Sequence, residues 1–184
     1  MARTRHLVAA AAFIALLAPS LADAKLTKVD GASIARFSAS GPGALKIEGT
    51  TPDVLVADDG TNVTITVPLA NLDTGIKLRN GHMRDKYLEV GKYPSAVLVV
   101  ARAALKIPAV GASATADAPG TMTIHGATRP VTFHYSASRN ANAMAVSGNL
   151  DLNINDYQIT VPSYLGVTVK PDIKVDIKFT ANDV

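Results

Sequence analysis

The strongest constraint on the fold of this chain is a two-residue alternation of apolar and polar side chains along short segments. The segment Asp172–Phe179 shows it most strictly, because every second residue is apolar and each residue between them is charged. Side chains of a β-strand point alternately to the two faces of a sheet, so this segment predicts a strand with one buried face. Asn62–Val67 and Val131–Tyr135 repeat the pattern.

Turn signals separate these segments. Clusters of glycine, proline and aspartate occur at Gly41–Gly43 and Asp58–Gly60, and a further turn is expected at Gly126–Pro130. Ala109–Pro119 is bland in composition and is expected to be loop in part. The alternating segments number roughly eight or nine, without a fixed-period repeat or a dividing linker. We therefore predict a single all-β domain, either a sandwich or an antiparallel β-barrel.

One window, Asn71–Pro94, departs from the strand pattern and is called the helical insert below. Its apolar residues Leu72, Ile76, Met83 and Tyr87 recur at helical spacing and would lie close to one face. The window carries five basic residues against three acidic ones. These are Lys77, Arg79, Arg84, Lys86 and Lys92 against Asp73, Asp85 and Glu89. A charged helix with one apolar face predicts a cover over an opening of the barrel.

The ends of this helix follow from residue type. Asp73 is placed to act as the N-cap, because its carboxylate can accept backbone N–H bonds from the first turn. Gly81 costs about 1 kcal/mol relative to alanine inside a helix. We therefore expect one short or broken helix near residues 76–90, ended by Gly91 and Pro94.

The first 24 residues have the pattern of a secretory signal peptide. Arg3 and Arg5 precede Leu7–Ala18, an apolar run too short to span a bilayer, and small residues at Ala22 and Ala24 suit a signal peptidase. We expect cleavage near Ala24, which leaves 25–184 as the folded domain in the periplasm or outside the cell.

The charge and cysteine content restrict the partners of the mature chain. Loss of Arg3, Arg5 and Asp23 lowers the formal net charge from +3 to +2, so nucleic acid is not an expected partner. The sequence has no cysteine, which excludes disulfides and a cysteine nucleophile.

Catalytic and metal-binding motifs are weak. Asp73-Thr74-Gly75 matches the tripeptide around an aspartic-protease carboxylate, but it occurs once, whereas that chemistry needs two carboxylates. A turn or helix cap is the favoured interpretation, and a small hydrolase using Asp73 with a histidine remains an alternative. His82, His125 and His134 match no compact ligand motif. We expect no metal, no cofactor and no enzymatic activity.

Three blocks of sequence together indicate a known family. The first runs from Leu72–Gly75 to Tyr93–Pro94, the second is Thr123–Val131, and the third joins Asp156–Ile159 with the terminal strand at Val175–Ile177. In order and spacing they resemble the YceI-like family of exported lipid-binding β-barrels. The resemblance implies an extended, lipocalin-like antiparallel barrel of about eight strands that holds an isoprenoid chain, for carriage or storage.

The interior of such a barrel can be filled by side chains or can hold a ligand. The residues alone favour a filled core, and the resemblance reverses that preference. The candidate ligand-binding residues are Phe37, Val63, Ile65, Val67, Ile76, Met83, Tyr87, Met122, Ile124, Phe133, Tyr135, Met144, Val146, Leu150 and Leu152.

The basic residues of the insert admit several interpretations. Arg79 and Arg84 are candidates for contact with an anionic head group, and the same window could dock on an anionic membrane or be a solvated helix face. The expected partner is an isoprenoid or another long-chain lipid; transient membrane contact and a homodimer are both compatible with the sequence. The alternative is a periplasmic interaction or stress-response barrel without a bound lipid.

Overall fold

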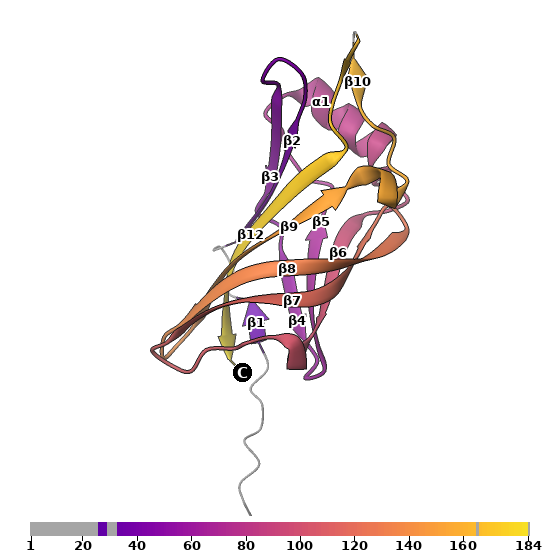
Figure 1. Ribbon diagram of the computed structural model, residues 1–184. Coiled ribbons are helices and arrows are strands. Elements are labelled where there is room, and N and C mark those ends of the chain that lie inside the picture. The colour runs from indigo at the N-terminus through magenta and orange to yellow at the C-terminus, as the bar shows by residue number, and fades with distance from the viewer. Residues whose placement is uncertain (1–25, 29–32, 165, 184) are drawn as a thin grey trace, which may run out of the picture.

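The computed structural model describes residues 26–28, 33–164 and 166–183, which form one rolled antiparallel sheet with a helical insert at one end (Figure 1). The predicted signal peptide lies outside the described residues. Ten strands share the main sheet, in the order β1-β4-β5-β6-β7-β8-β9-β12-β2-β3, and β10 and β11 form a separate hairpin. The strands are β1 Leu26–Lys28, β2 Ile34–Ser40, β3 Lys46–Thr51, β4 Leu55–Asp58, β5 Asn62–Pro68, β6 Ser95–Ala101, β7 Ser113–Ile124, β8 Ala127–Arg139, β9 Met144–Asn153, β10 Ser163–Tyr164, β11 Val167–Thr168 and β12 Asp172–Asp183.

The sheet closes into a barrel because β12 has two different neighbours along one edge. Its residues Ala181–Asp183 pair with β1, which also pairs with β4, so β1, β4, β5, β6, β7, β8, β9 and β12 form a ring of eight strands. Its earlier residues, Ile173–Lys178, pair with β2 instead. The predicted antiparallel barrel of about eight strands is therefore confirmed, and the β2–β3 hairpin extends its wall beyond the ring.

The extended end of the barrel is left open between β3 and β5. On the far side of β3 the described residues form a single bridge, Thr50 with Asp73, in place of a ladder. The helical insert fills this gap with an α-helix, α1 (Lys77–His82), and a π-helical turn, η1 (Met83–Tyr87). Leu69, Leu72 and Met83 form a small buried cluster there, and Phe37 of β2 packs against it. The predicted helical cover is confirmed.

The start of the insert differs from the prediction that Asp73 is an N-cap. Ile76 occupies that position, without a side-chain cap. The backbone of Asp73 is tied to Thr50, so its carboxylate is three residues too early and instead accepts the N–H of Gly75 at 2.8 Å and the amide of Asn80 at 2.6 Å. The predicted break is present, since the α-helix ends one residue after Gly81.

Two other local predictions need correction at their boundaries. Ala109–Pro119 is loop in part, as predicted, over residues 109–112, but β7 already begins at Ser113, because Ala114, Ala116 and Ala118 on its inward face give a weak apolar signal. The expected turn at Gly126–Pro130 is shorter, since β8 begins at Ala127. His125 and Gly126 form a two-residue hairpin turn with φ values of 51° and 76°, both in the left-handed region that such a turn requires.

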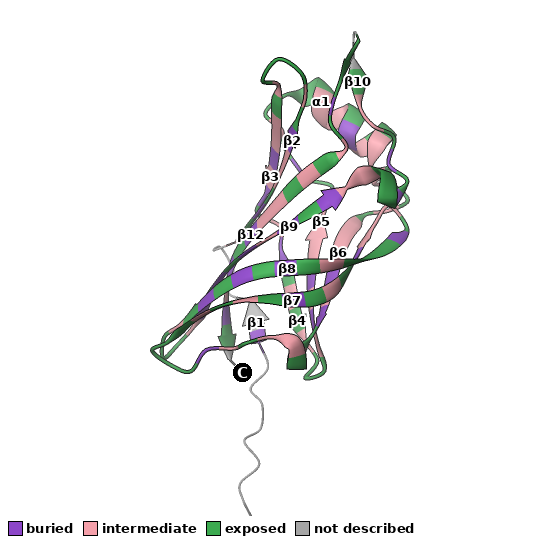
Figure 2. Ribbon diagram, viewed as in Figure 1, coloured by how far each residue is buried: buried purple, intermediate pink, exposed green. Residues whose placement is uncertain are grey.

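The end of the barrel remote from the insert is filled by side chains. Figure 2 shows buried and exposed residues alternating along β8 and β9, as expected for strands with one face inward. Tyr135, Met144, Val146 and Phe179 belong to this core. No helix in the described part of the chain is both long and apolar enough to cross a membrane.

Aromatic rings in the barrel are seated on glycines of neighbouring strands. A Cβ atom at Gly148 would lie 2.3 Å from Cζ of Phe133, and one at Gly49 would lie 2.2 Å from Cε1 of Phe37. Because real Cβ contacts do not come so close, each ring occupies the space that a side chain on the adjacent strand would need.

We predict that Gly148→Ala lowers the free energy of unfolding by about 1–3 kcal/mol, because the Phe133 ring must leave its position. Urea denaturation measures the change. Gly81→Ala is the matched control, since nothing lies within 4 Å of its Cβ position and alanine favours the helix. A Gly148→Ala protein as stable as the control would contradict this account of the ring's position.

Candidate functional site

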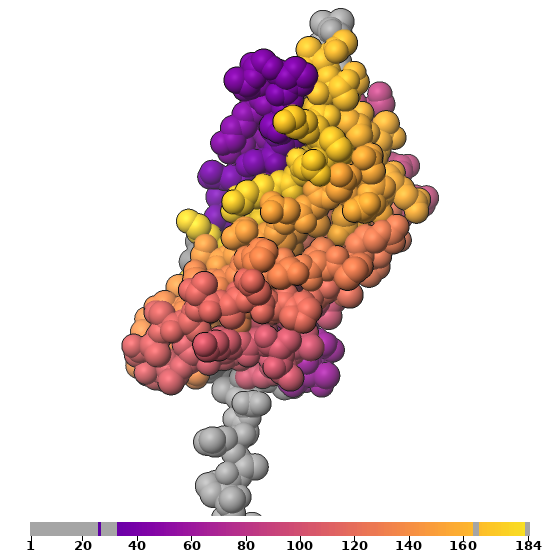
Figure 3. Space-filling model, viewed as in Figure 1, coloured from indigo at the N-terminus to yellow at the C-terminus, as the bar shows by residue number. Residues whose placement is uncertain are grey.

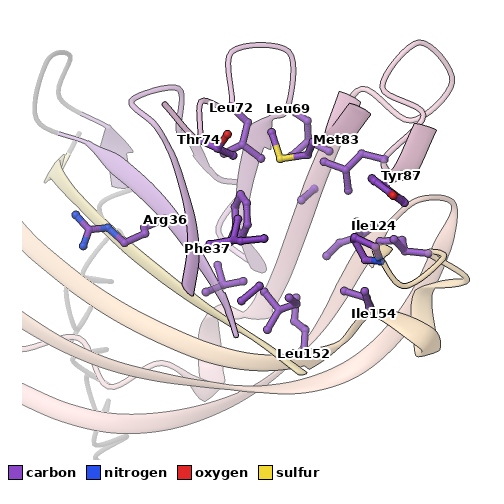
Figure 4. A pocket seen from close by; sticks show the side chains of 18 of the residues that line it. Arg36, Phe37, Leu69, Leu72, Thr74, Met83, Tyr87, Ile124, Leu152 and Ile154 are labelled. Atoms are coloured by element: carbon purple, nitrogen blue, oxygen red, sulfur yellow. The ribbon is translucent and has the colours of Figure 1, made fainter. Parts of the chain in front are cut away.

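An apolar cavity of about 800 Å³ lies between the open end of the sheet and the helical insert. Its volume falls within the range of about 300–1,000 Å³ that is typical of small-molecule sites. Side chains from β2, β5, β9 and β12 form its wall, and Leu72, Met83 and Tyr87 of the insert cover it (Figure 4). Among the described residues that line it, none is aspartate or glutamate. The cavity is therefore suited to an apolar ligand.

Most of the predicted ligand-binding residues lie on this wall. They are Phe37, Ile65, Val67, Ile76, Met83, Tyr87, Met122, Ile124, Phe133, Leu150 and Leu152. Val63, Tyr135, Met144 and Val146 are instead buried in the filled end of the barrel, away from the cavity lining. The Tyr135 hydroxyl accepts the backbone N–H of Lys106 at 2.6 Å. Alternation placed these four side chains inward correctly, but it does not show where packing ends and the cavity begins.

The two head-group candidates are placed differently. Arg79 lines the cavity, and its guanidinium donates from Nε to the Thr74 hydroxyl at 2.9 Å and from Nη2 to the Thr74 carbonyl at 2.7 Å. Arg84 is not on the wall; its Nη1 donates to the carbonyl of Ala70 at 3.1 Å. Only Arg79 is therefore positioned to meet a group inside the cavity.

Sequence reasoning missed a second set of wall residues. Among them are Ala39, Leu45, Ile47, Ala96, Leu98, Ile154, Tyr157, Ile159, Ile173, Val175 and Ile177. Those of β12 had a clear signal, because the strict alternation of that segment already placed Ile173, Val175 and Ile177 inward. Ile154 continues the alternation of β9 by one residue and was on its apolar face. Tyr157 and Ile159 belong to the third family block, but no local pattern placed them inward, since they lie at and after the end of a short 3₁₀ turn, Ile154–Tyr157.

The far end of the insert is fixed by His125 in the β7–β8 turn. The Nε2 of His125 lies 2.6 Å from the Glu89 carboxylate, and its Nδ1 lies 3.1 Å from the carbonyl oxygen of Tyr157. A carbonyl oxygen and a carboxylate oxygen both accept hydrogen bonds, so each ring nitrogen of His125 faces an acceptor group. The Tyr93 ring packs on the imidazole at a centroid distance of 4.7 Å. These contacts join the insert to two separate parts of the barrel.

The hydroxyl of Tyr157 is buried without a hydrogen-bond partner among the described residues. Tyr157 is 2% exposed, so its hydroxyl has little access to water. Burial, and secondarily the charge of Asp156, raises the pKa of this hydroxyl above its ordinary value of 10.0. Such a group normally opposes folding, because the hydrogen bonds it makes to water when unfolded are not replaced.

The sequence-family comparison identifies the chain's relatives. The model of the YceI-like domain matches residues 27–181, which is most of the chain. The chain belongs to the YceI-like family. A UPF0312 protein of Pseudomonas putida is 27% identical over 125 residues, 64% of this YceI-like chain and 62% of the relative. A UPF0312 protein of Pseudomonas savastanoi is 26% identical over 136 residues, covering 70% and 68% of the two chains.

Solved structures share the fold of this YceI-like chain. A polyisoprenoid binding domain from Saccharophagus degradans, implicated in plant cell wall breakdown, superposes with a TM-score of 0.71 at 20% identity, over 88% of this chain and 99% of that domain. BcnA of Burkholderia cenocepacia gives a TM-score of 0.62 at 20% identity, over 80% and 96% of the two chains. At this level of identity the likeness concerns the fold.

The hydrolase alternative required Asp73 and a histidine to meet in one pocket. The Asp73 carboxylate instead accepts hydrogen bonds from Gly75 and Asn80, and Asp73 does not line the cavity. The Asn80 and Gly75 hydrogen bonds, with Arg84 nearby, lower the pKa of Asp73. The carboxylate therefore organises the start of the insert in this YceI-like protein.

We predict that Tyr157→Phe raises the free energy of unfolding by about 1 kcal/mol, because it removes a buried hydroxyl that has no partner. Tyr135→Phe is the control and should lower it by about 1–2 kcal/mol, since the N–H of Lys106 would lose its acceptor. Urea denaturation distinguishes the two variants. A loss of stability in Tyr157→Phe would show that its hydroxyl does have a partner.

The same variant gives a pH test. The raised pKa means that the folded state keeps the Tyr157 proton above the pH at which the unfolded state releases it. Below the unfolded value of 10.0, Tyr157 does not make the free energy of unfolding depend on pH. Above that value the unfolded state loses the proton first, so the free energy of unfolding falls as pH rises. The stability advantage of Tyr157→Phe over the wild type should therefore widen above that pH.

Proposed function

We propose that this YceI-like protein binds an isoprenoid or a similar amphiphilic chain in the barrel cavity, as a carrier or store rather than as an enzyme. The observation that carries the proposal is the unfilled apolar cavity of about 800 Å³, closed on one side by the insert. A barrel with only a structural role gains stability by filling such space, since cavities reduce stability. The description of the Saccharophagus degradans domain as polyisoprenoid-binding supports the same class of ligand.

The wall chemistry favours a flexible hydrocarbon chain. Burial of apolar surface is non-directional and contributes about 0.8 kcal/mol for each CH₂ removed from water. Met83 and Met122 on the wall have unbranched, polarisable side chains that adapt to a methyl-branched chain. Phe37 and Phe133 line the same wall. Arg79 offers one cation for a polar end group.

Organic extraction and native mass spectrometry of the purified protein test the proposal directly. A prenyl lipid or similar amphiphile should be recovered in stoichiometric amount, or should bind when a short prenyl alcohol is added. A protein that carries no lipid and takes up no prenyl alcohol would refute it.

The proposal includes export. The basic residues, apolar run and small residues within 1–24 support a periplasmic or secreted protein. Expression of the full sequence followed by cell fractionation and intact-mass measurement should give a chain that begins at Lys25 outside the cytoplasm. Uncleaved protein confined to the cytoplasmic fraction would refute this part.

We predict that Val175→Trp weakens binding of a short prenyl alcohol about tenfold or more. Val175 lines the cavity, so an indole there displaces ligand equivalent to roughly two CH₂ groups. Val99→Trp is the matched control: Val99 is a half-buried valine of β6 that is not on the cavity wall. Isothermal titration should show near wild-type affinity for this control. The chain has no natural tryptophan, so each variant also carries a single fluorescent reporter.

A further inference from the structure

The cavity opens to solvent at a rim that exposes large apolar side chains. Ile76, Leu78 and Val167 all line the cavity, yet they are 51%, 65% and 43% exposed. A residue with both properties lies where the cavity meets the surface. The opening is therefore between the start of α1 and the β10–β11 hairpin, two elements that lie together at one end of the molecule (Figure 1). Figure 3 shows β2–β3 and β10–β11 next to each other at this end. We call this rim the mouth.

The side chains of the insert that line the cavity and can carry a positive charge are Arg79, His82 and Lys86, and no described aspartate or glutamate lines it. Lys77 is exposed beside Ile76 and Leu78. Lys77 and Lys86 form no ion pair with any described residue. The Nζ of Lys86 lies 5.4 Å from the centroid of the Tyr87 ring, a contact that leaves its charge uncompensated by any described carboxylate. An exposed apolar rim with such cations around it matches the chemistry of an anionic lipid surface, where apolar side chains enter the interface and lysines meet the phosphates.

We propose that the mouth docks on an anionic lipid bilayer, with Ile76, Leu78 and Val167 inserted among the head groups and Lys77 and Lys86 facing lipid phosphates. The inference rests on the proposed function, since it describes how the ligand reaches the cavity. A long prenyl chain is costly to expose to water. Docking of the mouth lets the chain pass from the bilayer to the cavity without crossing water.

The charges favour a bilayer over a second copy of the chain. Two mouths placed face to face would bring Lys77 and Lys86 of one copy against the same residues of the other. Among the described residues Asp85 is the one acidic side chain between Lys77 and Tyr87, which is too few to compensate. An anionic bilayer supplies the missing negative charge over the whole rim.

Vesicle flotation with the purified protein tests the proposal. Vesicles of phosphatidylcholine with phosphatidylglycerol should bind the protein, pure phosphatidylcholine vesicles should bind it much less, and added salt should release it. Lys77→Gln with Lys86→Gln should weaken binding to the anionic vesicles by roughly ten- to thirtyfold. Leu78→Ser should weaken it several-fold, because its insertion is lost.

Matched controls carry the same changes away from the mouth. Val110 is 59% exposed. It lies far from the mouth, because the N–H of its neighbour Gly111 donates to the carbonyl oxygen of Arg139, the last residue of β8, and the His125–Gly126 turn is at the other end of that strand. Val110→Ser, and Lys106→Gln with Lys178→Gln, should leave vesicle binding unchanged. Equal effects of mouth and control variants would overturn the proposal, as would absence of binding to anionic vesicles. Self-association through the mouth, detected by sedimentation and abolished by Leu78→Ser, would overturn it in favour of a second copy.

Failure of this inference is distinguishable from failure of the proposed function. Binding of a short prenyl alcohol is measured without vesicles in the wild type and in Lys77→Gln, whose side chain is not on the cavity wall. Prenyl-alcohol binding by a wild type that does not bind anionic vesicles would overturn docking and leave the cavity proposal intact. Loss of both in the wild type would refute the cavity proposal itself.

Discussion

The architecture depends on the two-sided pairing of β12. This strand pairs with β9 from Asp172 to Ala181, while its other edge changes partner from β2 to β1 along its length. The change of partner produces a closed ring at one end of the barrel and an extended, open wall at the other. Leu26 of β1 adds to the closure, because its N–H donates to the Asp58 carboxylate at 3.1 Å. One strand therefore determines where the barrel can be solid and where it can be hollow.

The inward face of the same strand crosses from the hollow part to the solid part. Ile173, Val175 and Ile177 line the cavity, whereas Phe179 and Ala181 lie in the buried core without lining it. At the open end the insert spans the gap between Phe37 of β2 and Ala96 of β6 without filling the space beneath it. The cavity is thus a consequence of an opening that is bridged by one short helix. The Phe37 and Phe133 rings pack directly against glycines of the adjacent strands, and this packing keeps both rings at the cavity wall.

The sequence predicted which side chains face inward. It predicted less well which of those side chains fill the core and which line the cavity. Period-two alternation identifies the inward face of β5, β8, β9 and β12, because it depends only on local geometry. It could not separate Ile65 on the cavity wall from Val63 in the core, since that distinction depends on where β12 exchanges β2 for β1. Ile76 was predicted to help cover the barrel, and its side chain instead lies at the exposed rim, because the helix begins only at Lys77. The first part of β7 was not predicted as a strand, because its alanines are small and give a weak apolar signal. The same small side chains fit a strand that is tightly paired with its neighbours.

The anchoring of the insert limits how far the insert can move. Its beginning is held by two backbone hydrogen bonds between Thr50 and Asp73, at 2.8 and 2.9 Å, and its end by the contact of Glu89 with His125 at 2.6 Å. Moving the whole insert would break both attachments and expose the Leu69, Leu72 and Met83 cluster to water, a cost of several kcal/mol on the scale of about 1.5–3 kcal/mol per large apolar side chain. The mouth already opens between these attachments and requires neither to break. Passage of a chain through a fixed, apolar, cationic rim is therefore the route that demands the least rearrangement.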